Sequence, residues 1–87
     1  MSYRIEFRPA ALRDMRRIPK PFKARLMAAI AALAQTPRPP RSVRLEGPEG
    51  FHRVRVGDYQ IVYLIRDRLL LICVVRVAHR KDVYRRL

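Results

Sequence analysis

A predicted β-hairpin, FHRVRVGDYQIVY, constrains the fold of this chain more than any other feature. Two runs rich in β-branched and aromatic residues flank Gly57-Asp58, a tight-turn signal. Alternation along the first run places Arg53 and Arg55 on one face and Val54 and Val56 on the other. With the valines buried, the two arginines lie side by side, where such a pair can grip adjacent phosphates. A merely solvated strand face is the alternative interpretation.

The size and charge of the chain limit how many domains it can form and which partners it can bind. Eighty-seven residues predict one domain, residues 1–87, with one modest core. Twenty Lys and Arg against seven Asp and Glu give a net charge of +13, which strains a small fold unless a polyanion binds it. Nucleic acid is the first candidate partner and an acidic protein the second. We expect no membrane binding, because no long basic amphipathic helix supports it.

The single cysteine, Cys73, lies in the apolar run Leu69 to Val75, which is too short to cross a bilayer. No disulfide can form within the chain, so a reducing cytoplasm fits best. We interpret Cys73 as a small buried hydrophobe, not a nucleophile. Two histidines and one cysteine do not support a zinc site, and no glycine-rich phosphate loop is present, so we expect neither metal nor cofactor.

The N-terminal half predicts a strand and two helices. Residues 3–7 alternate as a half-buried strand, and Pro9 then opens a helix. Pro19-Lys20-Pro21 ends that helix and starts a second, so the two should form an antiparallel pair. We expect the apolar stripe of the first helix to comprise Leu12 and Met15, with Ala11 and Ile18. That of the second comprises Phe22, Leu26, either Ala29 or Ile30, and Leu33. We expect the polar residues Arg13, Asp14, Arg16 and Arg17 to face water.

The C-terminal half predicts a meander of strands. TPRPPR is a rigid extended connection, residues 42–45 form a short strand, and the hairpin follows. After a turn at 66–68, residues 69–78 form a central strand, and the tail 79–87 is a short helix or an arm. The fold class is therefore α+β: an N-terminal strand and a helical hairpin packed on a twisted, mainly antiparallel sheet.

Alternation divides the side chains between the two faces of this sheet. We expect the helices to cover Val54, Val56, Ile61, Tyr63, Cys73 and Val75. The other face then carries Arg53, Arg55, Gln60 and Arg76, with Arg80 and Tyr84 of the tail folded near them. Several guanidiniums and a stackable aromatic suit a phosphodiester with an exposed base. No carboxylate is obviously placed to hold a metal, so catalysis there would be attack of an RNA 2′-OH on the adjacent phosphate.

The segments LEGPEGFHRVRVGDYQIVY and VAHRKDVYRRL, together with the element order, resemble the RelE/ParE superfamily of toxins from bacterial toxin–antitoxin systems. The resemblance covers essentially the whole chain, and GDYQIVY and HRKDVY are its most specific parts. It implies a ribosome-dependent endoribonuclease that cleaves messenger RNA and is silenced by a tightly bound antitoxin, as a hetero-oligomer. It also implies functions for four residues: Arg53 and Arg55 grip phosphates, Arg80 stabilises the transition state, and Tyr84 stacks on a base or handles protons.

The sequence departs from the family pattern at two points. Enzymatic relatives often have lysines where Arg53 and Arg55 stand, and arginine keeps its proton and cannot act as a base. Many relatives also have an arginine where this chain has Gln60. The general base is therefore open between Tyr84 and the two histidines, of which His79, next to Arg80, is the better candidate than His52.

Two other functions stay open at this stage. Superfamily members that resemble ParE inhibit DNA gyrase by binding and do not cut RNA. They generally lack the arginine-and-tyrosine set, which this chain largely retains. A non-catalytic RNA-binding module is the third reading, and only strand scission with a cyclic-phosphate end separates it from a nuclease.

Overall fold

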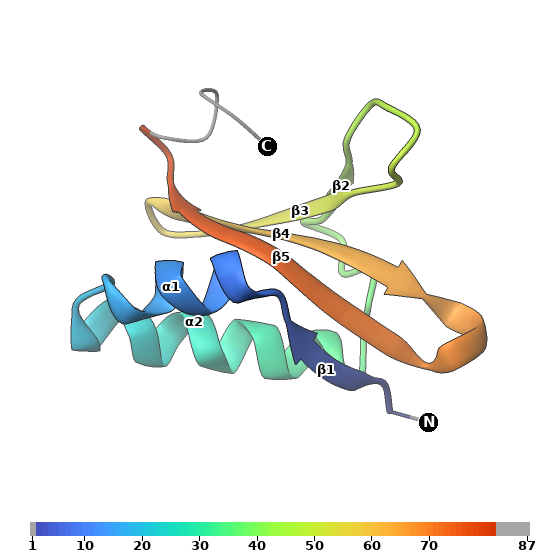
Figure 1. Ribbon diagram of the computed structural model, residues 1–87, viewed down its shortest axis with the longest axis horizontal. Coiled ribbons are helices and arrows are strands. Elements are labelled where there is room, and N and C mark those ends of the chain that lie inside the picture. Colours follow the sequence, from blue (N-terminus) through green and yellow to red (C-terminus); the bar gives the residue numbers. More distant parts are fainter. Residues whose placement is uncertain (1, 82–87) are drawn as a thin grey trace.

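The computed structural model describes residues 2–81, which form two layers: a helical hairpin on one face of a five-stranded sheet (Figure 1). The sheet order is β1-β5-β4-β3-β2; β1 runs parallel to β5, and the other neighbours are antiparallel. The elements are β1 (Arg4–Phe7), α1 (Pro9–Arg16), α2 (Lys20–Leu33), β2 (Val43–Arg44), β3 (His52–Val56), β4 (Tyr59–Arg66), the 3-10 helix η1 (Asp67–Leu69) and β5 (Leu71–His79). The α+β class, the helical hairpin and the element order are confirmed.

Prolines and glycines set several of the boundaries. Pro9 is the first residue of α1, and Pro19 precedes α2, positions where a missing N–H costs no helical hydrogen bond. Gly57 joins β3 to β4 with φ at +60°, a left-handed conformation that glycine adopts without steric cost. The expected C-terminal helix or arm lies outside the described residues, which end in a turn just after β5. Within residues 2–81, no helix combines the length and apolarity needed to span a membrane.

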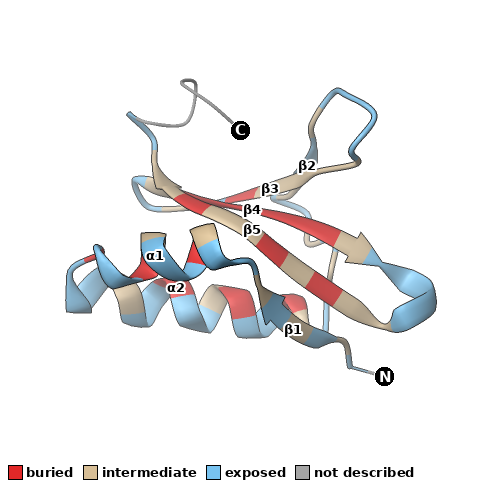
Figure 2. Ribbon diagram, viewed as in Figure 1, coloured by how far each residue is buried: buried red, intermediate tan, exposed pale blue. Residues whose placement is uncertain are grey.

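The core between the layers differs from the prediction along β5. Ile72, Val74 and Val77 are buried there, whereas Cys73 and Val75 are only partly buried (Figure 2). The cause is an irregularity in the pairing of β4 with β5. Val62 pairs with Arg76 but the next residue, Tyr63, pairs with Val74, so Val75 has no partner. Such a bulge reverses the alternation, and the prediction assumed unbroken alternation along the whole strand.

The helices also differ in detail from the predicted stripes. Met15, Leu26, Ile30 and Leu33 are buried as expected, together with Ala11 and Ile18. Leu12 and Phe22, both expected to be buried, are 45% and 44% exposed. The small side chain of Ala11 lies against the sheet in place of Leu12, which lets α1 approach β5 closely.

Candidate nucleic-acid interface

The sheet register brings the predicted basic residues into two neighbouring rows. In one row Arg53 pairs with Val62, which pairs with Arg76; in the other Arg55 pairs with Gln60, which pairs with Ala78. Directly paired residues share a face. Because the alternate residues Val54, Ile61 and Val77 belong to the core, these rows lie on the face away from the helices.

This face is only partly accessible. Arg55 is exposed, but Gln60 is 2% exposed and its neighbours Val62 and Leu64 are buried as well. Gln60 therefore does not offer its amide to a ligand in this conformation. The Nε atom of Arg53 is buried and has no hydrogen-bond partner among the described residues. A buried unpaired N–H is costly, and a phosphate oxygen is an acceptor that a guanidinium recognises well.

Arg76 is bound by the carboxylate of Asp14, a residue expected to face water. Asp14 of α1 accepts hydrogen bonds from Nε and Nη2 of Arg76, at 2.8 and 3.0 Å, and from the backbone N–H of Val77, at 2.8 Å. The side chain of Asp14 is 12% exposed. β1 pairs with β5 only as far as Val74, and Asp14 binds the unpaired edge of β5 beyond that residue, at the Val77 N–H. The bond to Asp14 raises the pKa of Arg76 further, and its guanidinium lies at the sheet edge, not over the basic rows.

Arg80 lies at the end of the sheet, beside the β3–β4 turn. Its backbone N–H donates to the carbonyl oxygen of Asp58 at 2.7 Å, and its Nε is 3.8 Å from the Asp58 carboxylate. The side chain is 72% exposed. The backbone hydrogen bond fixes the position of the Arg80 main chain. The ion pair is long and exposed to solvent, so the guanidinium can turn toward an incoming phosphate.

The two histidines both lie on the helix side of the sheet. His79 pairs with Tyr59, and their rings meet edge to face with centroids 5.2 Å apart. The backbone N–H of Lys81 donates to Nδ1 of His79 at 3.2 Å, so a neutral His79 carries its proton on Nε2. His52 packs against Tyr63, and burial lowers its pKa. Neither ring shares the face of Arg53 and Arg55. The aromatic candidate, Tyr84, lies outside the described residues.

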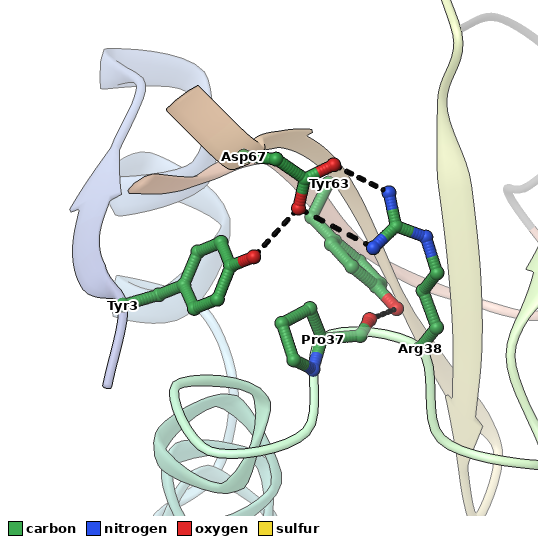
Figure 3. A network of polar contacts seen from close by, with 5 residues as sticks. All are labelled: Tyr3, Pro37, Arg38, Tyr63 and Asp67. Atoms are coloured by element: carbon green, nitrogen blue, oxygen red, sulfur yellow. Dashed lines mark hydrogen bonds and ion pairs between the residues drawn. The ribbon is translucent and has the colours of Figure 1, made fainter. Parts of the chain in front are cut away.

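A second polar network, also missed from sequence, ties the proline-rich connection to the sheet (Figure 3). Asp67 accepts a hydrogen bond from the Tyr3 hydroxyl at 2.6 Å and from Nη2 of Arg38 at 2.9 Å. Tyr63, which is fully buried, donates its hydroxyl to the Pro37 carbonyl at 2.7 Å. The hydrogen bond from Arg38, and then that from Tyr3, lowers the pKa of Asp67. These residues are far apart in sequence, so no local pattern pointed to them. Among residues 2–81, no three His, Cys, Asp or Glu side chains gather as metal ligands would.

Comparison with known proteins assigns the family. The family model for the ParE toxin of the type II toxin–antitoxin system parDE matches residues 5–84. The chain belongs to the RelE/ParE family of toxins. It is 31% identical over 91 residues to toxin RelG of Mycobacterium tuberculosis, covering 99% of this chain and 100% of RelG. It is also 31% identical over 88 residues to toxin RelE of the same organism, covering 95% of this chain and 87% of that toxin.

Solved structures of RelE/ParE toxins have the same fold. The toxin–antitoxin complex RelBE2 of Mycobacterium tuberculosis matches with a TM-score of 0.79 and 26% identity, over 92% of this chain and 100% of that chain. The archaeal RelE–RelB complex of Pyrococcus horikoshii matches in fold, with a TM-score of 0.81, 24% identity and coverage of 92% and 97%. The chain is thus a RelE-like toxin of a toxin–antitoxin system.

Proposed function

We propose that this toxin is a ribosome-dependent endoribonuclease that acts on messenger RNA in the cytoplasm. One observation carries the proposal: Arg53 and Arg55 occupy adjacent rows of one sheet face, and Arg55 is exposed there. A phosphodiester is an anion that such a pair of guanidiniums recognises well. The similarity to toxins named RelE and RelG supports the same branch of the family.

The reaction needs no group beyond RNA and protein side chains. The 2′-oxygen attacks the adjacent phosphorus, its proton passes to a general base, and the bond from phosphorus to the 5′-oxygen breaks as that oxygen takes up a proton. The products carry a 2′,3′-cyclic phosphate and a 5′-hydroxyl. Arg80 stabilises the charge that develops on the phosphate oxygens, and Arg53 and Arg55 hold the flanking backbone. Arg76 stays bound to Asp14 and acts at the sheet edge.

We propose that the general base lies in the tail, because neither His52 nor His79 shares the face of Arg53 and Arg55. Arginine does not lose its proton in proteins. The lone pair of His79 Nδ1 is occupied by the Lys81 N–H, and its Nε2 carries a proton. We therefore propose Tyr84 as the residue that relays the proton. His79→Gln tests this assignment: a large loss of rate with unchanged RNA binding would return the role of base to His79.

The test of the proposed function is to induce the toxin and map RNA ends in cells, with Arg80→Ala as the inactive variant. Loss of one charge-stabilising donor lowers the rate roughly a hundred- to a thousand-fold, so Arg80→Ala should abolish toxicity and leave the fold intact. Arg53→Ala and Arg55→Ala should mainly weaken RNA binding. Growth arrest with intact messenger RNA and inhibited DNA gyrase would instead establish ParE-like action. This alternative is kept because the matching family model is that of the ParE toxin.

We also propose that an antitoxin binds this toxin, as RelB does in the complexes of its structural relatives. The net charge of +13 favours an acidic or amphipathic segment on the partner. Co-expression with the neighbouring reading frame should yield a co-purifying pair and restore growth. Good yields of the toxin alone, without growth inhibition, would count against an intact toxic site.

A further inference from the structure

A hollow of about 360 Å³ lies where the end of α1 meets the last residues of β5. It is on the helix side of the sheet, around the strand end from Arg53 and Arg55. Its walls combine aromatic rings with guanidiniums: Asp14, Arg17, Ile18, Tyr59, Arg76 and His79 all line it. Arg76 was expected on the basic face and His79 as a possible base, but the other residues of this lining have no role in the reaction proposed above.

The aromatic wall is fixed in place. Tyr59 pairs with His79 across the sheet, and their rings meet at 82°. Tyr59 also packs on Phe22 of α2, with ring centroids 5.8 Å apart. The hydrogen bond from Lys81 to Nδ1 orients His79 and leaves Nε2–H as a donor. A preset aromatic surface with a nearby donor suits a nucleobase, which can both stack and accept a hydrogen bond.

The cationic wall is equally preset. Asp14 binds two nitrogens of the Arg76 guanidinium and so holds its plane at the rim of the hollow, with Nη1 outside that pair of bonds. Arg17, the residue that follows α1, is exposed and lines the same rim. Guanidiniums recognise phosphate groups with defined geometry. Because aromatic rings and guanidiniums occur together, the hollow fits a nucleotide better than an acidic peptide, which has no need of a stacking surface.

We propose that this hollow binds one nucleotide of the RNA strand, next to the segment held by the basic face. The proposal rests on the proposed function, since it assumes that the basic face binds RNA. His79 and Arg80 are consecutive at the end of β5, so a strand that passes the Arg80 guanidinium reaches the hollow by turning around the strand end. The hollow is then a flanking subsite that adds affinity without touching the reacting phosphate.

The test compares two adjacent arginines. Arg16 and Arg17 are both exposed and lie at the end of α1, but only Arg17 lines the hollow. Arg17→Ala and Arg16→Ala remove the same charge, so any general electrostatic effect is equal in both. The probes are single-stranded RNA oligonucleotides of about 4 and about 12 nucleotides, within the range of single-strand binding sites. A 2′-O-methyl group at every sugar blocks cleavage, and binding is measured across a series of salt concentrations.

We expect Arg17→Ala to weaken binding of the longer oligonucleotide at least fivefold more than Arg16→Ala does. The slope of log affinity against log salt should fall by about 0.7, as for one lost phosphate contact on a single strand. His79→Gln should also weaken binding of the longer oligonucleotide, by roughly fivefold or more, through lost stacking. Neither change should alter binding of the shorter one.

Equal effects of Arg17→Ala and Arg16→Ala would overturn the inference, as would failure of the unaltered protein to bind either oligonucleotide. Loss of antitoxin binding by Arg17→Ala, with RNA binding unchanged, would also overturn it and assign the hollow to a protein partner. The proposed function is decided separately by mapping RNA ends in cells, so cleavage in cells together with equal arginine effects would reject the subsite alone.

Discussion

Asp14 should contribute more to stability than any other carboxylate in the described part of the chain, and Asp14→Ala tests this. The substitution leaves the Val77 N–H and the Arg76 guanidinium without their acceptor. A buried unsatisfied donor costs about 1–3 kcal/mol, and a hydrogen bond to a charged group contributes about 1.5–3 kcal/mol. The Arg76 side chain is 36% exposed and can be partly rehydrated, so its share is discounted. We expect a total loss of about 2–4 kcal/mol.

A loss of this size from Asp14→Ala is a large part of the total free energy of unfolding. At roughly 0.05–0.15 kcal/mol per residue, a domain of this size is stable by only about 4–13 kcal/mol. The assay is urea unfolding followed by far-ultraviolet circular dichroism. With an m-value of about 1 kcal/mol/M, expected for a small protein, the midpoint should fall by about 2 M or more while m stays unchanged.

Glu6→Ala is the matched control, because it removes the same charge from an exposed ion pair on β1. Glu6 pairs with Arg4 at 3.4 Å, and both side chains are more than half exposed. Its loss should change stability by no more than about 0.5 kcal/mol. If Asp14→Ala and Glu6→Ala lower the urea midpoint equally, the capping of β5 by Asp14 contributes nothing measurable and the reasoning fails.

Four further outcomes are expected from unfolding experiments. Tyr63→Phe should lower the free energy of unfolding by about 1 kcal/mol, because its hydrogen bond to Pro37 is lost. Burial raises the pKa of Tyr63, so as pH rises this tyrosine ionises in the unfolded chain before it does in the folded one. The variant should therefore lose less stability than the parent above about pH 10. Asp67 has a lowered pKa in the fold, so its stabilisation is present above about pH 4 and lost as pH falls through that lower pKa; in acid titrations Asp67→Asn should lack this step. Gly57→Ala, at φ +60°, should lower the urea midpoint by the equivalent of about 1 kcal/mol. Val54→Asp should abolish the cooperative transition, and a folded Val54→Asp protein would show that the hairpin faces are assigned the wrong way round.

Local patterns in the sequence predicted most of the elements. The alternation around Val54 and the turn at Gly57 identified the hairpin, and its register then placed Arg53 and Arg55 on the face away from the helices. These predictions succeeded because strand alternation depends only on neighbouring residues. The bulge at Val75 depends instead on how β4 and β5 pair. The prediction therefore placed Cys73 in the core where Ile72 and Val74 are buried.

Asp14 shows the same limit at the candidate site. In the sequence Asp14 stands next to Arg13 and close to Arg16 and Arg17, a charge cluster typical of a solvated face. Its partner Arg76 is 62 residues away, and the two meet only because β1 ends at Phe7 and leaves the edge of β5 open. A signal was present nonetheless, since an arginine inside an apolar strand needs an acceptor or an opening to water. The acceptor in the fold is the Asp14 carboxylate at the sheet edge.

The end of β5 explains why one stretch of sequence serves two surfaces. Successive residues of a strand point to opposite faces, so His79 packs on Tyr59 on the helix side, while Arg80 pairs with Asp58 at the hairpin turn. Adjacency in sequence had suggested that His79 and Arg80 act on one phosphate as base and cation. The geometry separates them, and His79→Gln distinguishes the two assignments. If His79 is the general base, its loss should slow cleavage without weakening RNA binding. If it is a stacking partner, its loss should weaken binding of long RNA and leave cleavage of bound RNA unchanged.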